Sequence, residues 1–301
     1  MVRRMTDLAA GSSPGGAEFS LDPAIGTGNW EAYTLPIELI FTAAEQWRRQ
    51  LDGVRKPWLC WNVSAQWCLL QQKLVRHVGW TPVVGFDPRV GPPPLIPEAI
   101  LIDFNKSFQF PVMWPHFPLE FAFLFTPRLA FWHADLLCRL PVLEELARGF
   151  SSLDPGRMAA VLDKGGRRNY LNFKSHRYWE LCGCTTREAS ENQFYNGTGW
   201  WRYFDRHPKC VAPEERARRR AYSYDSGVGI LYWKNNYNGA ITDIDIRSVK
   251  EGHCSEIGAR NYVNAPNHLT AWRNLASELE SNYSLDEVAK TLGIARLLDS
   301  A

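Results

Sequence analysis

Long apolar runs and an excess of one charge are both missing from this sequence of 301 residues. A membrane span needs about 18 consecutive apolar residues, and the most apolar candidate, residues 117–140, is interrupted by prolines and charged side chains. Lysine and arginine number 34, aspartate and glutamate number 32, and the formal net charge is +2. A nucleic-acid-binding surface would be strongly basic. We therefore expect no membrane span and no nucleic-acid partner.

Several common sequence signatures are absent as well. The chain has no phosphate-binding Walker loop, no dinucleotide-binding glycine fingerprint and no His-Glu-x-x-His motif, which argues against the commonest NTPases, dehydrogenases and zinc hydrolases. The N-terminus lacks the apolar segment of a signal peptide. The seven cysteines are dispersed and odd in number, so reduced thiols and a cytoplasmic location are expected.

Tryptophan, by contrast, is abundant, with 13 residues beside 11 tyrosines and 15 phenylalanines. This composition is typical either of an aromatic core or of a site where flat or sugar-like ligands stack. Three tryptophans lie in or beside apolar segments and are expected in the core: Trp58, Trp114 and Trp132. Four others lie near a predicted strand end or after a glycine turn, and their exposure decides between the two explanations: Trp61, Trp67, Trp200 and Trp201.

Short apolar segments bounded by proline or glycine alternate with amphipathic segments as far as residue 150. Strands are predicted at Pro57–Val63, Pro82–Phe86, Ala99–Phe104 and Arg128–Trp132, and helices at Leu35–Gln50, Ser64–His77 and Leu136–Phe150. Strands that are apolar throughout are buried on both faces of a sheet. The pattern therefore predicts an α/β fold with a mostly parallel central sheet flanked by helices.

The regular alternation ends near residue 151. Further on, strands are predicted at Val228–Trp233 and Ala240–Ile246, and helices at Leu269–Leu279 and Leu285–Leu297. The basic segment Arg216–Arg220 is expected to be a solvated helical face, with an anion contact as the alternative. We predict a flexible arm over residues 1–25, a ligand-binding half over 26–150 and a mixed α+β half over 151–301, packed as one unit.

The segment His133-Ala134-Asp135 follows the predicted strand Arg128–Trp132 directly. Residues two apart at a strand end point the same way, so this imidazole and this carboxylate can share one cation. Mg²⁺ prefers oxygen ligands, whereas an imidazole favours Mn²⁺. A structural explanation stays open, in which Asp135 caps the next helix and His133 is a buried histidine.

The order of elements over residues 57–150 resembles the nucleotide-sugar-binding half of GT-A glycosyltransferases. In that family an Asp-x-Asp motif follows an apolar strand and holds a divalent metal against the diphosphate of the donor. Asp135 corresponds to the acid that binds the metal, and His133 replaces the first acid. The resemblance implies a Mn²⁺ or Mg²⁺ cofactor, a nucleotide-sugar donor, and a small-molecule or glycan acceptor. Such enzymes often recruit a late histidine, for which His253 is the first candidate.

The same resemblance assigns the ends of the predicted strands to the nucleotide sugar. The expected binding residues, in addition to Asp135, are Trp61, Asn62, Ser64, Asp87, Arg89 and Asp103. Each also has a simpler explanation as a loop-capping polar residue or a core tryptophan.

The second half of the chain is expected to bind the acceptor. The candidate contacts are Trp200, Trp201 and Arg177, and the candidates for the general base on an acceptor hydroxyl are Asp205 and Glu180. Two alternatives remain open: a non-catalytic carbohydrate- or ligand-binding protein that has lost the metal, and a metal-dependent hydrolase.

Overall fold

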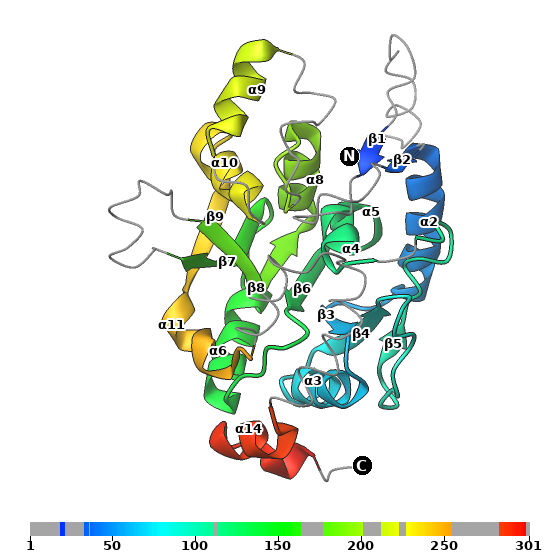
Figure 1. Ribbon diagram of the computed structural model, residues 1–301, viewed down its shortest axis with the longest axis vertical. Coiled ribbons are helices and arrows are strands. Elements are labelled where there is room, and N and C mark those ends of the chain that lie inside the picture. Colours follow the sequence, from blue (N-terminus) through cyan, green and yellow to red (C-terminus); the bar gives the residue numbers. More distant parts are fainter. Residues whose placement is uncertain are drawn as a thin grey trace, which may run out of the picture.

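The computed structural model describes residues 19–21, 33–35, 37–110, 113–163, 177–200, 212–222, 227–254 and 283–298. Within this part, one sheet has seven strands in the order β5-β4-β3-β6-β8-β7-β9 (Figure 1). Its strands are β3 (Pro57–Asn62), β4 (Thr81–Phe86), β5 (Ile100–Leu101), β6 (Arg128–Trp132), β7 (Arg157–Asp163), β8 (Arg177–Thr186) and β9 (Ala240–Asp245). The short strands β1 (Phe19–Leu21) and β2 (Tyr33–Leu35) pair separately in antiparallel fashion.

The large sheet is mixed but mostly parallel, which confirms the predicted fold class. β3 is parallel to β4 and β6, and β4 is parallel to β5. β8 runs antiparallel to β6 and β7, while β7 is parallel to β9. The chain moves outward from β3 to β4 and β5, then returns to the other side of β3 as β6. Sheets of this kind bind ligands beyond the carboxyl ends of the strands where the order reverses, here between β3 and β6.

Helices pack on both faces of the sheet. One face carries α2 (Ile37–Gln50), α4 (His116–Glu120), α5 (Ala122–Phe125), α8 (Arg187–Asn196) and α10 (Val228–Asn236). The other carries α3 (Ala65–His77), α6 (Leu140–Ser151), α11 (Ile246–Val249) and α14 (Leu285–Thr291). The side chains of β6 alternate, with Leu129 and Phe131 in the first core and Ala130 and Trp132 in the second. The strand is therefore buried on both sides, as its continuous apolar sequence predicted.

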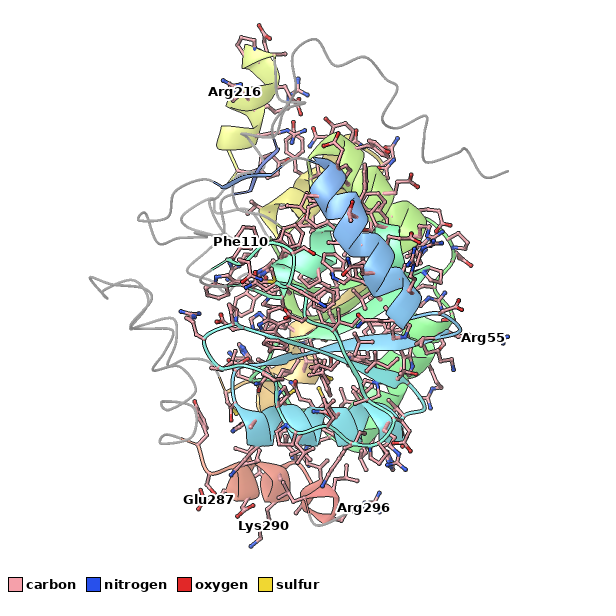
Figure 2. The ribbon with its side chains drawn as sticks, turned by 90° about the vertical axis from the view of Figure 1, so that its right-hand side faces the viewer. Arg55, Phe110, Arg216, Glu287, Lys290 and Arg296 are labelled. Atoms are coloured by element: carbon pink, nitrogen blue, oxygen red, sulfur yellow. The ribbon has the colours of Figure 1, made fainter. Side chains whose placement is uncertain are left out.

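Three elements remain: α9 (Pro213–Arg220) and the short helices η2 (Lys250–Gly252) and η3 (Ala295–Leu297). In the view turned by 90°, α9, marked by Arg216, and α14, marked by Glu287 and Lys290, lie at opposite ends (Figure 2). No helix in the described part of the chain is long and apolar enough to cross a membrane. The six cysteines that this part contains are free and buried.

Burial of aromatic rings in the core, in places directly against a glycine, explains much of the tryptophan content. Trp61 of β3 pairs in register with Gly85 of β4, and its ring occupies the space that a Cβ at position 85 would need. Phe131 of β6 lies over Gly183 of β8 in the same way. On the opposite face, the ring centroid of Trp58 lies 5.2 Å from that of Trp132. The large rings thus fill the core between the sheet and its helices.

Most predicted elements are present, but one was assigned the wrong type. Residues Val228–Trp233, predicted as a strand, form the first part of helix α10. A short apolar run that is buried all round has no periodicity by which a strand differs from a helix. The segment Leu285–Leu297 is divided into α14 and η3, because Gly293 has a φ of 70°. The predicted helix Leu269–Leu279 and most of the arm 1–25 lie outside the described residues.

The basic segment Arg216–Arg220 also differs from its prediction. Arg216 and Arg218 on α9 are exposed, as a solvated face requires, but Arg219 is only 2% exposed. Its guanidinium donates hydrogen bonds to the backbone carbonyls of Asn196 and Gly197 at the end of α8. Arg219 is therefore a buried anchor that docks α9 onto α8.

Candidate metal centre

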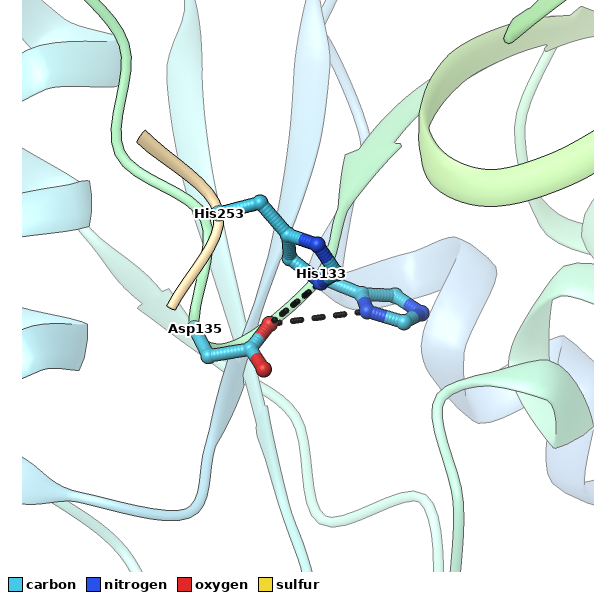
Figure 3. A group of neighbouring side chains, drawn as sticks. All are labelled: His133, Asp135 and His253. Carbon is cyan, nitrogen blue, oxygen red and sulfur yellow. Dashed lines mark ion pairs between the residues drawn. The ribbon is translucent and has the colours of Figure 1, made fainter. Parts of the chain in front are cut away.

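His133, Asp135 and His253 meet at the carboxyl end of β6 (Figure 3). Nδ1 of His133 and Nε2 of His253 each lie 3.5 Å from Oδ1 of Asp135. One potential ligand atom from each residue lies within 4.8 Å of the other two. The group could hold a metal ion, and it contains the three residues that the sequence predicted as ligands.

The spacing of these atoms fits a shared ion better than direct hydrogen bonding. Asp135 Oδ1 is buried and accepts no hydrogen bond from the described residues. Charge-assisted N–H···O bonds are about 2.7–2.9 Å long, so separations of 3.5 Å are too long for strong ones. Two ligand atoms that each lie about 2.1 Å from a tetrahedral ion are about 3.4 Å apart. Two imidazoles and a carboxylate suit Mn²⁺, Fe²⁺ or Zn²⁺ better than Mg²⁺.

Gln71 of α3 fixes the turn that carries His133 and Asp135. Its side chain is fully buried, and Nε2 donates hydrogen bonds to the carbonyls of His133, at 2.7 Å, and Leu136, at 2.9 Å. The amide of His133 in turn donates to the carbonyl of Leu181 on β8. These bonds hold residues 133–136 as a turn, so α6 begins only at Leu140 rather than at the predicted Leu136.

His253 reaches the site through backbone pairing between distant segments. Leu136 and His253 form an isolated antiparallel bridge. The amide of Leu137 donates a hydrogen bond to the carbonyl of Gly252 at 3.0 Å. The amide of Cys254 donates one to the backbone carbonyl of Asp135 at 3.1 Å. A Cβ at Gly252 would overlap the carbonyl of Leu137, so this close approach requires glycine. The pairing places the His253 imidazole beside the Asp135 carboxylate.

Glu180 extends the cluster on the other side of His133. Its Oε1 lies 3.6 Å from Nε2 of His133 and 3.1 Å from Nε2 of His116, which begins α4. The pairing of β7 with β8 jumps from Ala160↔Gly183 to Val161↔Trp179, so residues 180–182 have no partner on β7. Such a bulge changes the direction of a side chain, here that of Glu180. The result is a row in which imidazoles and carboxylates alternate, made of His116, Glu180, His133, Asp135 and His253.

The charges in this row depend on one another. Burial alone would lower the pKa of His133, but the carboxylates of Asp135 and Glu180 raise it to about 10. Burial disfavours both carboxylates, yet the imidazoles hold the pKa of Asp135 below its usual value and that of Glu180 well below. Burial lowers the pKa of His253 to about 4. Without a metal, His133 is charged and His253 neutral, so a bound ion would displace the proton of His133.

Replacing Gln71 with methionine should lower the free energy of unfolding by about 2–3 kcal/mol, because the carbonyls of His133 and Leu136 each lose the hydrogen bond from its side chain. The adjacent Gln72 is an unusually close control, since it is also fully buried and binds the backbone of Pro94 and Ile96, away from the metal centre. Urea unfolding should show similar losses for Gln71→Met and Gln72→Met. Only Gln71→Met should weaken Mn²⁺ binding; equal Mn²⁺ affinities would contradict the role of Gln71 in fixing the turn.

The other polar residues predicted for the nucleotide sugar lie at the ends of β3, β4 and β5 but bind protein groups. Both oxygens of Asp87 accept hydrogen bonds from the guanidinium of Arg89, at 2.8 and 2.7 Å. Asn62 donates to the carbonyl of Gly91 at 2.8 Å, and the exposed Asp103 accepts from the amide of Asn105 at 3.0 Å. Ser64 is buried where α3 begins. These contacts stabilise the loops at the carboxyl edge, and a nucleotide-binding role stays a prediction.

The aromatic residues predicted to stack on ligands are buried where the structure describes them. Trp61 and Trp67 are each 1% exposed and Trp200 is 2% exposed, with the Trp200 ring edge-on to Phe131 at 5.4 Å. Trp61 and Trp200 therefore present no open ring face, since neighbouring core groups cover them. Arg177 lies over the ring of Trp179, 4.4 Å from its centroid. Trp201 and Asp205 lie outside the described residues.

Comparisons of the chain with models of protein families, with curated proteins and with solved structures found no match. A function for this protein is therefore inferred from its fold and from the side chains at the end of β6.

Proposed function

We propose that this protein is a metal-dependent glycosyltransferase that moves a sugar from a nucleotide-diphosphate donor to a small-molecule or glycan acceptor. The observation that carries the proposal is the group His133, Asp135 and His253, located where the strand order of the sheet reverses. In the GT-A family that the sequence resembles, the metal-binding acid also follows an apolar strand, and a late histidine often joins it. Asp135 follows strand β6 and His253 lies 3.5 Å from its carboxylate, which supports the proposal.

The three residues would hold the ion, and the bound ion would supply positive charge to stabilise the leaving diphosphate. The loops after β3 and β4, with Asn62, Ser64 and the Asp87–Arg89 pair, lie on the same carboxyl edge and would bind the nucleotide. The half of the chain from residue 151 would supply the acceptor site, and Arg177 and Trp201 are the candidate residues for contacting the acceptor.

Asp205 is the better candidate for the general base. Glu180 was the other, but its carboxylate faces two imidazoles and its pKa is held well below the usual range. A carboxylate so stabilised in its charged form is a weak proton acceptor.

A metal-dependent hydrolase is the second candidate. Two histidines and one carboxylate also bind the catalytic zinc of several hydrolases, with the remaining position open to water. The side chain of His133 is 29% exposed, so one side of the group is partly open to solvent. A binding protein that has lost its metal is less favoured, because all three candidate ligands are retained.

The test is thermal unfolding with a panel of nucleoside diphosphates and nucleotide sugars, each with and without Mn²⁺. One nucleotide should stabilise the protein by about 2.7 kcal/mol at about 100 times its Kd, and more weakly without Mn²⁺. The variant Asp135→Ala should lose the Mn²⁺-dependent part while keeping its fold by circular dichroism. The exposed Asp52→Ala is the control. If Mn²⁺ stabilises the protein but no nucleotide does, the transferase proposal is wrong and the hydrolase is favoured.

A further inference from the structure

Glu180 is the one acid of the row that is excluded from the group of potential metal ligands. That group comprises His133, Asp135 and His253, whereas Glu180 faces His133 from the side opposite Asp135. Its side chain is only 12% exposed. A carboxylate is costly to bury without a charged or hydrogen-bonding partner, and the partners here are the imidazoles of His116 and His133. Its placement also requires a break in the β7–β8 pairing.

We propose that Glu180 is a positioning residue that fixes His133 for metal binding, and that His116 holds Glu180 in place. Of the two ring nitrogens of His133, Nδ1 faces Asp135 at 3.5 Å and Nε2 faces Glu180 at 3.6 Å. A neutral imidazole carries one N–H, and the other nitrogen is the ligand. A carboxylate beside Nε2 keeps the proton there, so Nδ1 is the nitrogen presented to the ion.

Histidines that bind metals commonly donate their second N–H to a carboxylate, which sets the tautomer and the direction of the ring. Glu180 has the right chemistry and lies on the right side of the ring for this task; at 3.6 Å its oxygen favours the proton on Nε2 by its charge rather than through a strong hydrogen bond. The 3.1 Å contact with His116 Nε2 holds Oε1, the same oxygen that faces His133. This inference rests on the metal centre of the proposed function, but it does not depend on which reaction the centre performs.

The first experiment measures Mn²⁺ binding without any nucleotide, by the electron paramagnetic resonance signal of free Mn²⁺. Removing an outer carboxylate of this kind costs about 10–100-fold in metal affinity. We therefore expect the Kd to rise in the order wild type, Glu180→Gln, Glu180→Leu, because glutamine keeps an acceptor oxygen and leucine keeps none. His116→Gln should give a smaller increase than Glu180→Leu, because it acts one residue further from the ion.

A matched control separates positioning from general stability. Glu215 is another acid with a side chain of low exposure, 19%, and it belongs to a separate network with Arg219. The variant Glu215→Gln should lower stability but leave the Kd for Mn²⁺ within about twofold of wild type, since it lies in a different network. If Glu215→Gln weakened Mn²⁺ binding as much as Glu180→Gln, the effect would be structural and the proposal would be wrong.

The second experiment observes the ring of His133 directly. In the Co²⁺-loaded wild type, proton NMR should show a strongly shifted, exchangeable N–H signal from Nε2 of His133. This signal should exchange rapidly or vanish in Glu180→Leu, while a signal from His253 persists. An unchanged signal and an unchanged Kd would overturn the role of Glu180 and leave the metal centre intact.

The remaining outcomes distinguish the two proposals. Failure of the wild type to bind Mn²⁺ or Co²⁺ would overturn both the metal centre and the role of Glu180. A Glu180-dependent Kd together with no nucleotide binding would support the positioning role and contradict only the transferase.

Discussion

Replacing Glu215 with alanine should lower the free energy of unfolding by about 3–5 kcal/mol, as expected when one member of a buried ion pair is removed. Oε1 of Glu215 lies 2.9 Å from Nε of Arg219, whose side chain is 1% exposed. The same oxygen accepts hydrogen bonds from the hydroxyls of Tyr232, at 3.0 Å, and Tyr237, at 3.1 Å. Alanine would remove the carboxylate of Glu215 from beside the buried guanidinium and would leave both hydroxyls without this acceptor.

Urea unfolding measures this loss, and Glu214 provides its control. Glu214 is the preceding residue in the first turn of α9 but is exposed, so Glu214→Ala should change stability by about 0.5 kcal/mol at most. Hydrogen exchange should show that the amides of α9 lose the most protection in Glu215→Ala, since Arg219 docks this helix onto α8. Similar losses for the two variants would mean that the Arg219 network adds little to stability.

The pH dependence of this contribution has a definite sign. Burial disfavours the charged form of Glu215, but hydrogen bonds from Arg219 and the two tyrosines hold its pKa below the ordinary 4.5. A group whose pKa is lowered by folding stabilises the protein above its unfolded pKa, and this stability is lost as the pH falls through the folded pKa. The difference in stability between wild type and Glu215→Gln should therefore be full at pH 7 and shrink below about pH 4.5.

The first half of the fold could be predicted because its strands are apolar on both faces. The prediction Arg128–Trp132 coincides with β6, and Ser64–His77 differs from α3 by one residue at its start. Strands β7 and β8 were not predicted, although both belong to the same sheet. β8 contains Arg177, Glu180 and a bulge, so its sequence does not show the continuous apolar run of β6. Its inclusion depends on pairing with distant strands, which local sequence does not show.

The metal centre was partly predictable for a similar reason. His133 and Asp135 stand out because they follow an apolar strand at a spacing of two, and this signal is local. Glu180 was predicted only as a candidate general base, since its contact with His133 depends on the bulge, which the sequence does not show. His116 was missed, because a single histidine among aromatic residues is more often part of the core. Gln71 was not singled out in the helix predicted over Ser64–His77, because a polar residue on an amphipathic helix gives no local sign of burial; it is fully buried and holds the turn at residue 133.

Adding Mn²⁺ at about 100 times its Kd should stabilise the wild type by about 2.7 kcal/mol, and this gain should vanish in Asp135→Asn. Asp135 supplies the single carboxylate of the ligand group, and its Oδ1 is the atom that both imidazoles face. Asparagine keeps the shape of the side chain but removes the negative charge, so only two imidazoles and a neutral amide would be left to bind the ion. Thermal and urea unfolding with and without Mn²⁺ measure the gain.

Asp243→Asn is the matched control for this prediction. Asp243 lies on strand β9 and accepts a hydrogen bond from the hydroxyl of Tyr178 at 2.6 Å, and it forms an ion pair with Lys234 at 3.2 Å. It is therefore also a carboxylate with defined partners. It belongs to no group of potential metal ligands among the described residues. The Asp243→Asn variant should gain as much stability from Mn²⁺ as the wild type does, even if it is less stable than the wild type without Mn²⁺. Should Asp135→Asn keep that stabilisation as well, the ion would bind elsewhere on the chain. The long 3.5 Å contacts in Figure 3 would then be ion pairs of a metal-free protein, with His133 charged between two acids.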